Sequence, residues 1–204
     1  GHAKDFAQKT KKELLSMLHV PTSERQFIMY EALRKGATVE ELEELTKIKT
    51  YFIQQMKELV EEEEALLQYK GRVPDIEALR QAKLDGFSDK YLSEILGVAE
   101  EEIRNARTEA GIVEGWEGVH VSGTPDSAYY YSSYHIKDES PCSDKKKIMI
   151  LGGGPNRIGQ GIEFDYCCVH AAIALKELGF ETIIVNCNPE TVSTDYDTSD
   201  KLYF

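Results

Sequence analysis

A run of glycines between two short apolar segments constrains the fold of this chain more than any other feature. The apolar segment 148–151 is followed directly by Gly-Gly-Gly-Pro-Asn-Arg-Ile-Gly-Gln-Gly at 152–161, and a helical pattern at about 164–178 ends at Gly179. A second apolar segment follows at 182–186. A strand, a glycine loop, a helix and a second strand in this order are typical of a parallel βαβ unit. The sequence therefore predicts an α/β fold for the C-terminal part of the chain.

The glycine loop does not identify a ligand by itself. A dinucleotide-binding loop has the pattern Gly-x-Gly-x-x-Gly, and Arg157 stands where the third glycine is required. Such sites also place an acidic residue after the second strand, where this chain has Asn186 and Asn188. A phosphate-binding P-loop would end in Gly-Lys-Ser/Thr, which this string lacks. The loop alone therefore gives little support to an NAD or nucleotide site.

Helix start and stop signals recur from about residue 10 to residue 111. Capping-box spacing is present at three places, Thr10 with Glu13, Ser23 with Gln26 and Thr38 with Glu41. Pro74 fits the first position of a later helix. We therefore expect residues 1–112 to form a mainly α-helical domain.

This helical part contains a weak internal repeat. Residues of similar character recur fifty positions apart: Gly36, Thr38, Leu42, Leu45, Ile48 and Ile53 correspond to Gly86, Ser88, Leu92, Ile95, Val98 and Ile103. Each copy predicts a short helix, a tight turn and a second helix. Paired helices of this kind can bind DNA, but glutamates flank both candidate recognition helices, and DNA phosphates would repel them. A packing and interface domain is the better interpretation.

Residues 113–144 lose helical periodicity. Glycines and Pro125 interrupt this stretch, and four tyrosines follow within a few positions. We expect an aromatic-rich connector of irregular, extended chain whose rings pack against neighbouring structure.

The charge and the cysteines limit the partners that the chain can have. The formal net charge is -12, which disfavours nucleic acid and anionic membranes as partners. No apolar run approaches the length of about 18 residues that a membrane span needs, and no signal peptide opens the sequence. The cysteines, Cys142, Cys167, Cys168 and Cys187, lack Cys-x-x-Cys spacing, so we expect no metal site. Reduced, buried thiols of a cytoplasmic protein are the expectation.

Two longer strings resemble one enzyme family. Residues 152–170 read Gly-Gly-Gly-Pro-Asn-Arg-Ile-Gly-Gln-Gly-Ile-Glu-Phe-Asp-Tyr-Cys-Cys-Val-His, and residues 186–200 read Asn-Cys-Asn-Pro-Glu-Thr-Val-Ser-Thr-Asp-Tyr-Asp-Thr-Ser-Asp. Both resemble the large subunit of carbamoyl phosphate synthetase, at the start of its second, carbamoyl-phosphate-forming half. Residues 79–89, Leu-Arg-Gln-Ala-Lys-Leu-Asp-Gly-Phe-Ser-Asp, are similar to the oligomerisation domain that precedes this half. Residues 119–124 depart from the family, which usually has an Ala-Ala-Glu-Phe-like segment there.

The resemblance implies a fold and a division of labour. The expected fold is a helical oligomerisation-type domain, 1–112, then the connector, then a truncated α/β unit at 145–204, the first βαβ of a Rossmann-like pre-ATP-grasp domain. The family makes carbamoyl phosphate from bicarbonate, glutamine-derived ammonia and two ATP with Mg²⁺, and it uses a glutamine amidotransferase small subunit. This implies an ATP-dependent ligase of arginine or pyrimidine biosynthesis. We expect the chain to be a non-catalytic fragment that forms a homo-oligomer and holds no cofactor, because the ATP-clamping residues would lie beyond Phe204.

The resemblance also implies a set of site residues. Gly161, Glu163 and Glu190 match positions that line the internal tunnel for carbamate. A small glycine would keep the bore open, and carboxylates could hydrogen-bond carbamic acid. An alternative for the glutamates is a helix-terminus role, since an acidic side chain is favoured where a helix begins. The glycine-rich loop consists of Gly152, Gly153 and Gly154. A diverged, self-standing interaction module without synthetase activity is the rival interpretation of the whole chain.

Overall fold

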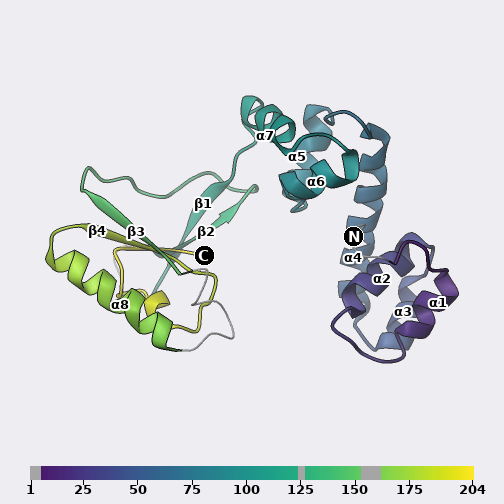
Figure 1. Cartoon of the computed structure of the whole chain (residues 1–204), viewed down its shortest axis with the longest axis horizontal. Coiled ribbons are helices and arrows are strands. Elements are labelled where there is room, and N and C mark those ends of the chain that lie inside the picture. Colours follow the sequence, from purple (N-terminus) through teal and green to yellow (C-terminus); the bar gives the residue numbers. More distant parts are fainter. Residues whose placement is uncertain (1–5, 124–126, 153–161) are drawn as a thin grey trace. The chain divides into compact units, whose positions relative to one another are not determined.

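The computed structural model describes residues 6–123, 127–152 and 162–204, which fall into two compact units (Figure 1). The first unit extends to Ile112 and the second begins at Val113. The chain is therefore helical in its first part and contains helices and a five-stranded mixed sheet in its second.

The first unit consists of helices joined by short turns. Their bounds are α1 Lys11–Met17, α2 Arg25–Arg34, α3 Val39–Thr46, α4 Thr50–Leu66, η1 Leu67–Tyr69, α5 Ile76–Leu84, α6 Asp89–Leu96 and α7 Glu100–Glu109. The α1–α4 part buries a continuous apolar core that includes Leu14, Ile28 and Leu42.

Two of the predicted helix starts are confirmed and two are wrong. Thr10 and Thr38 each cap a helix and take part in a reciprocal capping box with the glutamate three residues later. The second helix, however, begins at Arg25 with Glu24 in the cap position, so Ser23 is not its cap. Helix α5 begins at Ile76, so Pro74 is not its first residue. Asp75 is the cap, and its carboxylate accepts a hydrogen bond from the Ala78 N–H at 3.0 Å. A side-chain acceptor aimed at a free N–H fixes the start of a helix more firmly than a proline nearby.

The internal repeat is confirmed and is longer than the sequence indicated. Helices α2, α3 and α4 begin at positions that α5, α6 and α7 reproduce about fifty residues later. Gly36 and Gly86 have φ values of 84° and 88°, a left-handed conformation that glycine adopts without a steric penalty. Leu42 and Leu92 are fully buried, and so are Ile53 and Ile103. Each copy is therefore a three-helix unit with the same turn geometry.

A group of charged side chains is buried in the first copy. The Arg34 guanidinium from α2 makes ion pairs with Glu31 and with Glu63 and Glu64 of α4, and its Nε lies 2.7 Å from Glu64 Oε1. The Glu63 side chain is fully buried, and its carboxylate also accepts a hydrogen bond from the Tyr30 hydroxyl at 2.7 Å. Burial, together with this carboxylate, raises the pKa of Tyr30. One arginine thus joins α2 to α4.

The second copy buries a different ionic group. Asp89 lies 2.8 Å from Lys83 Nζ and 2.8 Å from Arg107 Nε. Burial alone would raise the pKa of Asp89, but hydrogen bonds from these two cations outweigh it and lower the pKa. Arg107 Nη1 also donates to the Ile112 carbonyl oxygen at 3.2 Å, at the last residue of the unit.

The second unit is built on one mixed sheet. Its elements are β1 Gly115–His120, β2 Ser127–Ser133, β3 Lys147–Leu151, α8 Ile162–Glu177, β4 Glu181–Val185, η2 Val192–Thr194 and β5 Lys201–Tyr203. The strand order is β1-β2-β5-β4-β3, in which β1 and β2 are antiparallel and the other neighbours are parallel. The predicted βαβ unit is confirmed as β3–α8–β4, and α8 packs on the sheet through Ala172 and Ile184 (Figure 1).

The expected irregular connector contains a β-hairpin. Residues 115–120 and 127–133 pair as β1 and β2, and β2 continues into the sheet through β5. The expectation of an irregular path is therefore wrong for these residues, although aromatic packing is present. Tyr203 of β5 stacks on Tyr130 with ring centroids 5.1 Å apart and meets Trp116 edge-on at 4.9 Å. A cross-strand partner more than seventy residues away in the sequence stabilises these strands, so the local sequence did not reveal them.

The hairpin requires glycine at its first position. A Cβ on Gly115 would lie 2.5 Å from the Ile136 carbonyl oxygen and 2.6 Å from the Lys137 carbonyl carbon. Both contacts are with backbone atoms, which cannot rotate away. Gly115 therefore lets the segment after the hairpin pass close to β1.

The cysteines are unpaired, as expected, but they are not buried as a group. Cys142, Cys167 and Cys187 are exposed, and Cys168 is partly exposed. The prediction of buried thiols is therefore wrong, since none of the four is buried. Among the residues that the structure describes, no helix has both the length and the apolar character needed to cross a membrane.

Candidate functional site

Two of the predicted site residues, Gly152 and Glu190, lie after the carboxyl ends of two neighbouring parallel strands. The glycine loop follows β3, and the segment 186–194 follows β4. In open α/β sheets, ligands bind outside the carboxyl ends of the strands. This edge of the sheet is therefore the candidate functional site.

Gly152 brings the two segments into contact. Its N–H donates to the Val185 carbonyl oxygen at 2.8 Å, which extends the pairing of β3 with β4. A Cβ on Gly152 would lie 3.1 Å from Cβ and Cγ of Asn186, and the Asn186 side chain is itself buried. The first glycine of the loop thus allows the close approach of the asparagine that ends β4.

The segment after β4 is a compact loop held by its own polar side chains. Asn186 Oδ1 accepts from the Asn188 N–H, and Asn188 Oδ1 accepts from the Glu190 N–H, both at 3.1 Å. The Thr194 hydroxyl donates to the Asn188 carbonyl oxygen at 3.0 Å. Two successive turns of this kind replace the ladder hydrogen bonds that end with the strand. The loop therefore has a defined shape, although its only regular element is the short helix η2.

Asp165 attaches this loop to helix α8. Its buried carboxylate accepts hydrogen bonds from the Val192 N–H at 2.8 Å and from the Ser193 N–H at 3.2 Å. These are the first backbone N–H groups of η2, which need an acceptor outside their own helix. Reasoning from the sequence did not single out Asp165. Its partners lie 27 and 28 positions away, and the signal was limited to an acidic residue in the first turns of a helix that faces a polar loop.

The structure places the expected tunnel residues only in part. Glu163 is the second residue of α8, two positions before Asp165, and its side chain lies outside the described residues. Glu190 is exposed in the loop after β4. Asp165 brings the first turns of α8 and this loop together, so the backbone of both expected glutamates belongs to one region. Gly161, Gly153 and Gly154 lie outside the described residues.

The described part of the site offers amides and hydroxyls rather than a metal-binding set. The buried polar side chains of the loop are those of Asn186, Asn188, Ser193 and Thr194, and the buried carboxylate of Asp165 lies beside them. Within residues 6–123, 127–152 and 162–204, no group of three His, Cys, Asp or Glu side chains is arranged to hold a metal ion. Chemically, this arrangement fixes a loop and presents Glu190 to solvent.

Two family models together match nearly the whole chain. The carbamoyl-phosphate synthetase large chain oligomerisation domain matches residues 1–111. The carbamoyl phosphate synthase preATP-grasp domain matches residues 144–204.

Curated relatives agree with these models. The carbamoyl phosphate synthase large chain of Neisseria meningitidis serogroup B is 50% identical over 197 residues, which is 95% of this chain and 18% of the relative. The large chain of Archaeoglobus fulgidus is 50% identical over 203 residues, covering 96% of this chain and 19% of the relative. That of Vibrio parahaemolyticus is 53% identical over 185 residues, covering 89% and 17%. The chain thus spans about a fifth of the length of these relatives, and it belongs to the carbamoyl phosphate synthase large chain family.

Proposed function

We propose that this chain works as the part of a carbamoyl phosphate synthase large chain that links assembly to the second, carbamoyl-phosphate-forming half. The observation that carries the proposal is the order of the two matched domains, oligomerisation at 1–111 and preATP-grasp at 144–204, over nearly the whole chain. In this proposal residues 1–112 supply assembly and spacing. Residues 145–204 are the opening βαβ unit of a Rossmann-like domain, which the parallel pairing of β3 with β4 supports.

The proposed parent reaction joins bicarbonate, ammonia from glutamine and two ATP into carbamoyl phosphate. ATP and Mg²⁺ would act elsewhere in the parent protein, and we assign neither of them to a residue of this chain. A glutamine amidotransferase small subunit would supply the ammonia, and the helical unit would contact a second copy of the large chain. We expect the isolated chain to be inactive with ATP.

Gly161, Glu163 and Glu190 are the residues that we propose to line the carbamate route. Carbamate decomposes in water, so its transfer requires a passage that excludes bulk solvent. The hydrogen bonds from Val192 and Ser193 to Asp165 support this proposal, because they hold the loop that carries Glu190 against the helix that carries Glu163. A fixed loop is what a passage of constant bore needs.

The proposed function can be tested in a chimaera. Residues 1–204 would replace the matching segment of the Neisseria meningitidis large chain, to which they are 50% identical. We expect the purified chimaera, with its small subunit, to form carbamoyl phosphate from glutamine, bicarbonate and ATP. The isolated chain should hydrolyse no ATP above the blank. A chimaera that folds and assembles but forms no carbamoyl phosphate would refute the proposal.

The tunnel assignment is tested in the same chimaera by Gly161→Phe, with Gly161→Ala as the matched control. A phenyl ring in the bore should lower overall synthesis steeply. Bicarbonate-dependent ATP hydrolysis in the first half, and ATP formation from ADP and carbamoyl phosphate in the second, should continue. If all three activities fall together, the substitution disrupts folding, and if synthesis stays normal, Gly161 does not line the route. Either result removes the tunnel role.

A further inference from the structure

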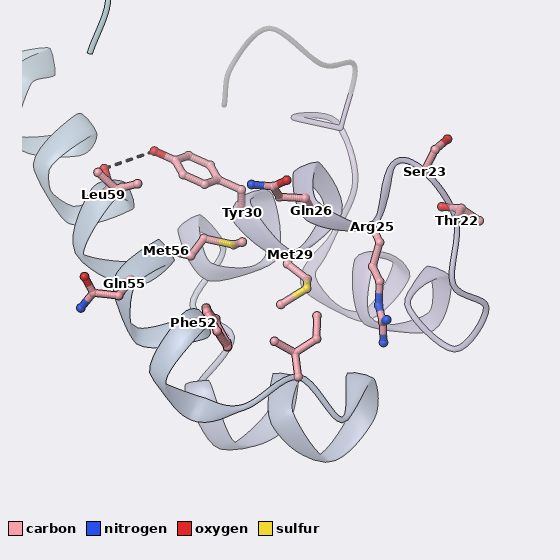
Figure 2. Close-up of a pocket in the computed structure, with 11 residues that line it drawn as sticks. Thr22, Ser23, Arg25, Gln26, Met29, Tyr30, Phe52, Gln55, Met56 and Leu59 are labelled. Carbon is pink, nitrogen blue, oxygen red and sulfur yellow. Dashed lines mark hydrogen bonds between the residues drawn. The ribbon is translucent and has the colours of Figure 1, made fainter. Parts of the chain in front are cut away.

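An apolar groove runs between α2 and α4 on the surface of the helical unit (Figure 2). It has a volume of about 550 Å³. Its apolar lining comes from Met29 and Tyr30 of α2, Ile48 before α4, and Phe52, Met56 and Leu59 of α4. The Tyr30 hydroxyl donates to the Leu59 carbonyl oxygen at 3.2 Å and joins α2 to α4 at this part of the lining (Figure 2).

The groove continues toward the second copy of the repeat. A second hollow of about 450 Å³ shares Gln26, Tyr30 and Leu59 with the first. Its further lining includes the stacked rings of Phe87 and Tyr91. The two hollows therefore adjoin at Gln26, Tyr30 and Leu59, and the second extends to residues of the second three-helix copy.

Large apolar side chains in this groove are open to solvent. Phe52 is 63% exposed, and Phe27 and Leu59 are each 38% exposed. Apolar surface of this kind gains about 25 cal/mol for each Å² that a partner covers. Two methionines in the lining add side chains that adapt their shape to an incoming apolar group. Two adjoining hollows with several exposed apolar side chains fit successive side chains of a polypeptide segment better than one compact small molecule.

The border of the groove is acidic. A further hollow beside Leu59 is lined by Glu58, Glu61, Glu62 and Asp85. Lys57 neutralises Glu61 at 2.6 Å, but in the described residues no lysine or arginine pairs with Glu58, Glu62 or Asp85. Burial, and then the charge of Asp85, raises the pKa of Glu62. Three of these four carboxylates therefore have no salt bridge among the described residues, and Lys57, which pairs with Glu61 and also interacts with the charge of Glu58, balances the border only in part.

We propose that this groove binds an amphipathic helix of a partner polypeptide, with apolar side chains in the groove and lysines or arginines beside the acidic border. The apolar lining supplies the affinity, and the carboxylates select a basic partner over an acidic one. A second copy of this chain fits the border poorly, because its net charge is -12.

The first test compares two synthetic helical peptides by fluorescence anisotropy. Both carry leucines at the same positions with helical spacing, and the polar positions hold lysine in one peptide and glutamate in the other. We expect the lysine peptide to bind the 204-residue chain at least about tenfold more tightly than the glutamate peptide. Equal binding of the two peptides, or no binding of the lysine peptide, would overturn the proposal.

The second test uses variants on the groove and beside it. Phe52→Ala should weaken binding of the lysine peptide at least about tenfold, since an aromatic anchor is lost. Tyr51→Ala is the matched control, because Tyr51 is 66% exposed, touches Phe52 edge-on and does not line the groove. The double variant Glu58→Gln with Glu62→Gln should reduce the preference for lysine over glutamate. Circular dichroism would show that each variant is folded.

Self-association provides the opposing outcome. If light scattering shows that Phe52→Ala abolishes association of the chain with itself, while the lysine peptide binds neither form, the groove accepts a second copy and the proposal is wrong. Loss of peptide binding by Tyr51→Ala to the same degree as by Phe52→Ala would also contradict it, because the groove would then not be the binding surface.

Discussion

Replacing Asp165 by alanine should destabilise the second unit more than the loss of any exposed carboxylate. The Asp165 side chain is buried, and it accepts hydrogen bonds from the backbone N–H groups of Val192 and Ser193. Alanine removes the acceptor and leaves both N–H groups without it. The loop that carries Glu190 would then lose its attachment to α8.

The expected cost follows from these hydrogen bonds. An unsatisfied buried donor costs about 1–3 kcal/mol, and hydrogen bonds to a charged acceptor lie at the upper end of the usual range. Ser193 is fully buried, whereas Val192 is 48% exposed and its N–H can regain water. We therefore expect Asp165→Ala to lower the free energy of unfolding by about 3 kcal/mol. Asp165→Asn keeps one acceptor oxygen and should cost about half as much.

Urea unfolding followed by tryptophan fluorescence measures this effect. Trp116 is the sole tryptophan of the chain and lies in β1 of the second unit, where it meets Tyr203. Its emission therefore reports on the unit that contains Asp165. With a slope of about 1.5 kcal/mol/M, a loss of about 3 kcal/mol moves the midpoint by about 2 M.

Asp197→Ala is the control, because Asp197 is an exposed carboxylate in the same unit. It should change the free energy of unfolding by less than about 0.5 kcal/mol. If Asp165→Ala lies within the same range as this control, the carboxylate does not hold the loop, and the argument for a fixed passage fails with it.

Three further predictions concern other features. Arg34→Met removes the cation from two buried glutamates and should lower the free energy of unfolding, measured by thermal unfolding, by about 3–5 kcal/mol. Arg104→Met, in the exposed ion pair of α7, should lower it by less than about 0.5 kcal/mol, and similar losses for the two variants would contradict the prediction. The lowered pKa of Asp89 contributes stability above pH 3.8, and this stability disappears as the pH falls through the folded-state pKa. Asp89→Asn should therefore make the free energy of unfolding, followed by circular dichroism, depend less on pH in acid, and an unchanged pH profile would refute this. Gly115→Ala should destabilise the hairpin by about 2 kcal/mol in the Trp116 assay, because its Cβ meets backbone atoms, and an unchanged midpoint would show that the backbone gives way.

Local signals predicted the elements whose causes are local. Thr10 and Thr38 cap helices through residues three positions away, and a sequence displays that spacing directly. The repeat was visible for the same reason, since Gly36 and Gly86 must each leave a helix in a left-handed conformation. The apolar runs around the glycine loop predicted β3 and β4, and β4 is buried as a continuously apolar parallel strand should be, whereas β3 lies at the edge of the sheet and is partly exposed.

Features that depend on distant partners were missed. The hairpin of β1 and β2 joins the sheet through β5, and its aromatic packing requires Tyr203, some seventy residues after Tyr130. The attachment of the loop after β4 requires Asp165, and no spacing rule connects an acid in a helix to two N–H groups beyond the next strand. The resemblance to the family supplied the expected tunnel residues; the residues by themselves favoured helix-terminus roles for the glutamates.

The buried ion pair at Asp89 has a consequence for how the helical unit ends. The terminal residues of a domain ordinarily fray first, because few contacts hold them. Here Arg107 donates both to Asp89 and to the carbonyl oxygen of Ile112, which is itself buried. A pull on the chain beyond Ile112 would therefore act first on the hydrogen bonds between Ile112 and Arg107, and Asp89 holds the guanidinium of Arg107 in place. The C-terminal end of the helical unit, at Ile112, is thus held against a pulling force by side-chain as well as backbone hydrogen bonds.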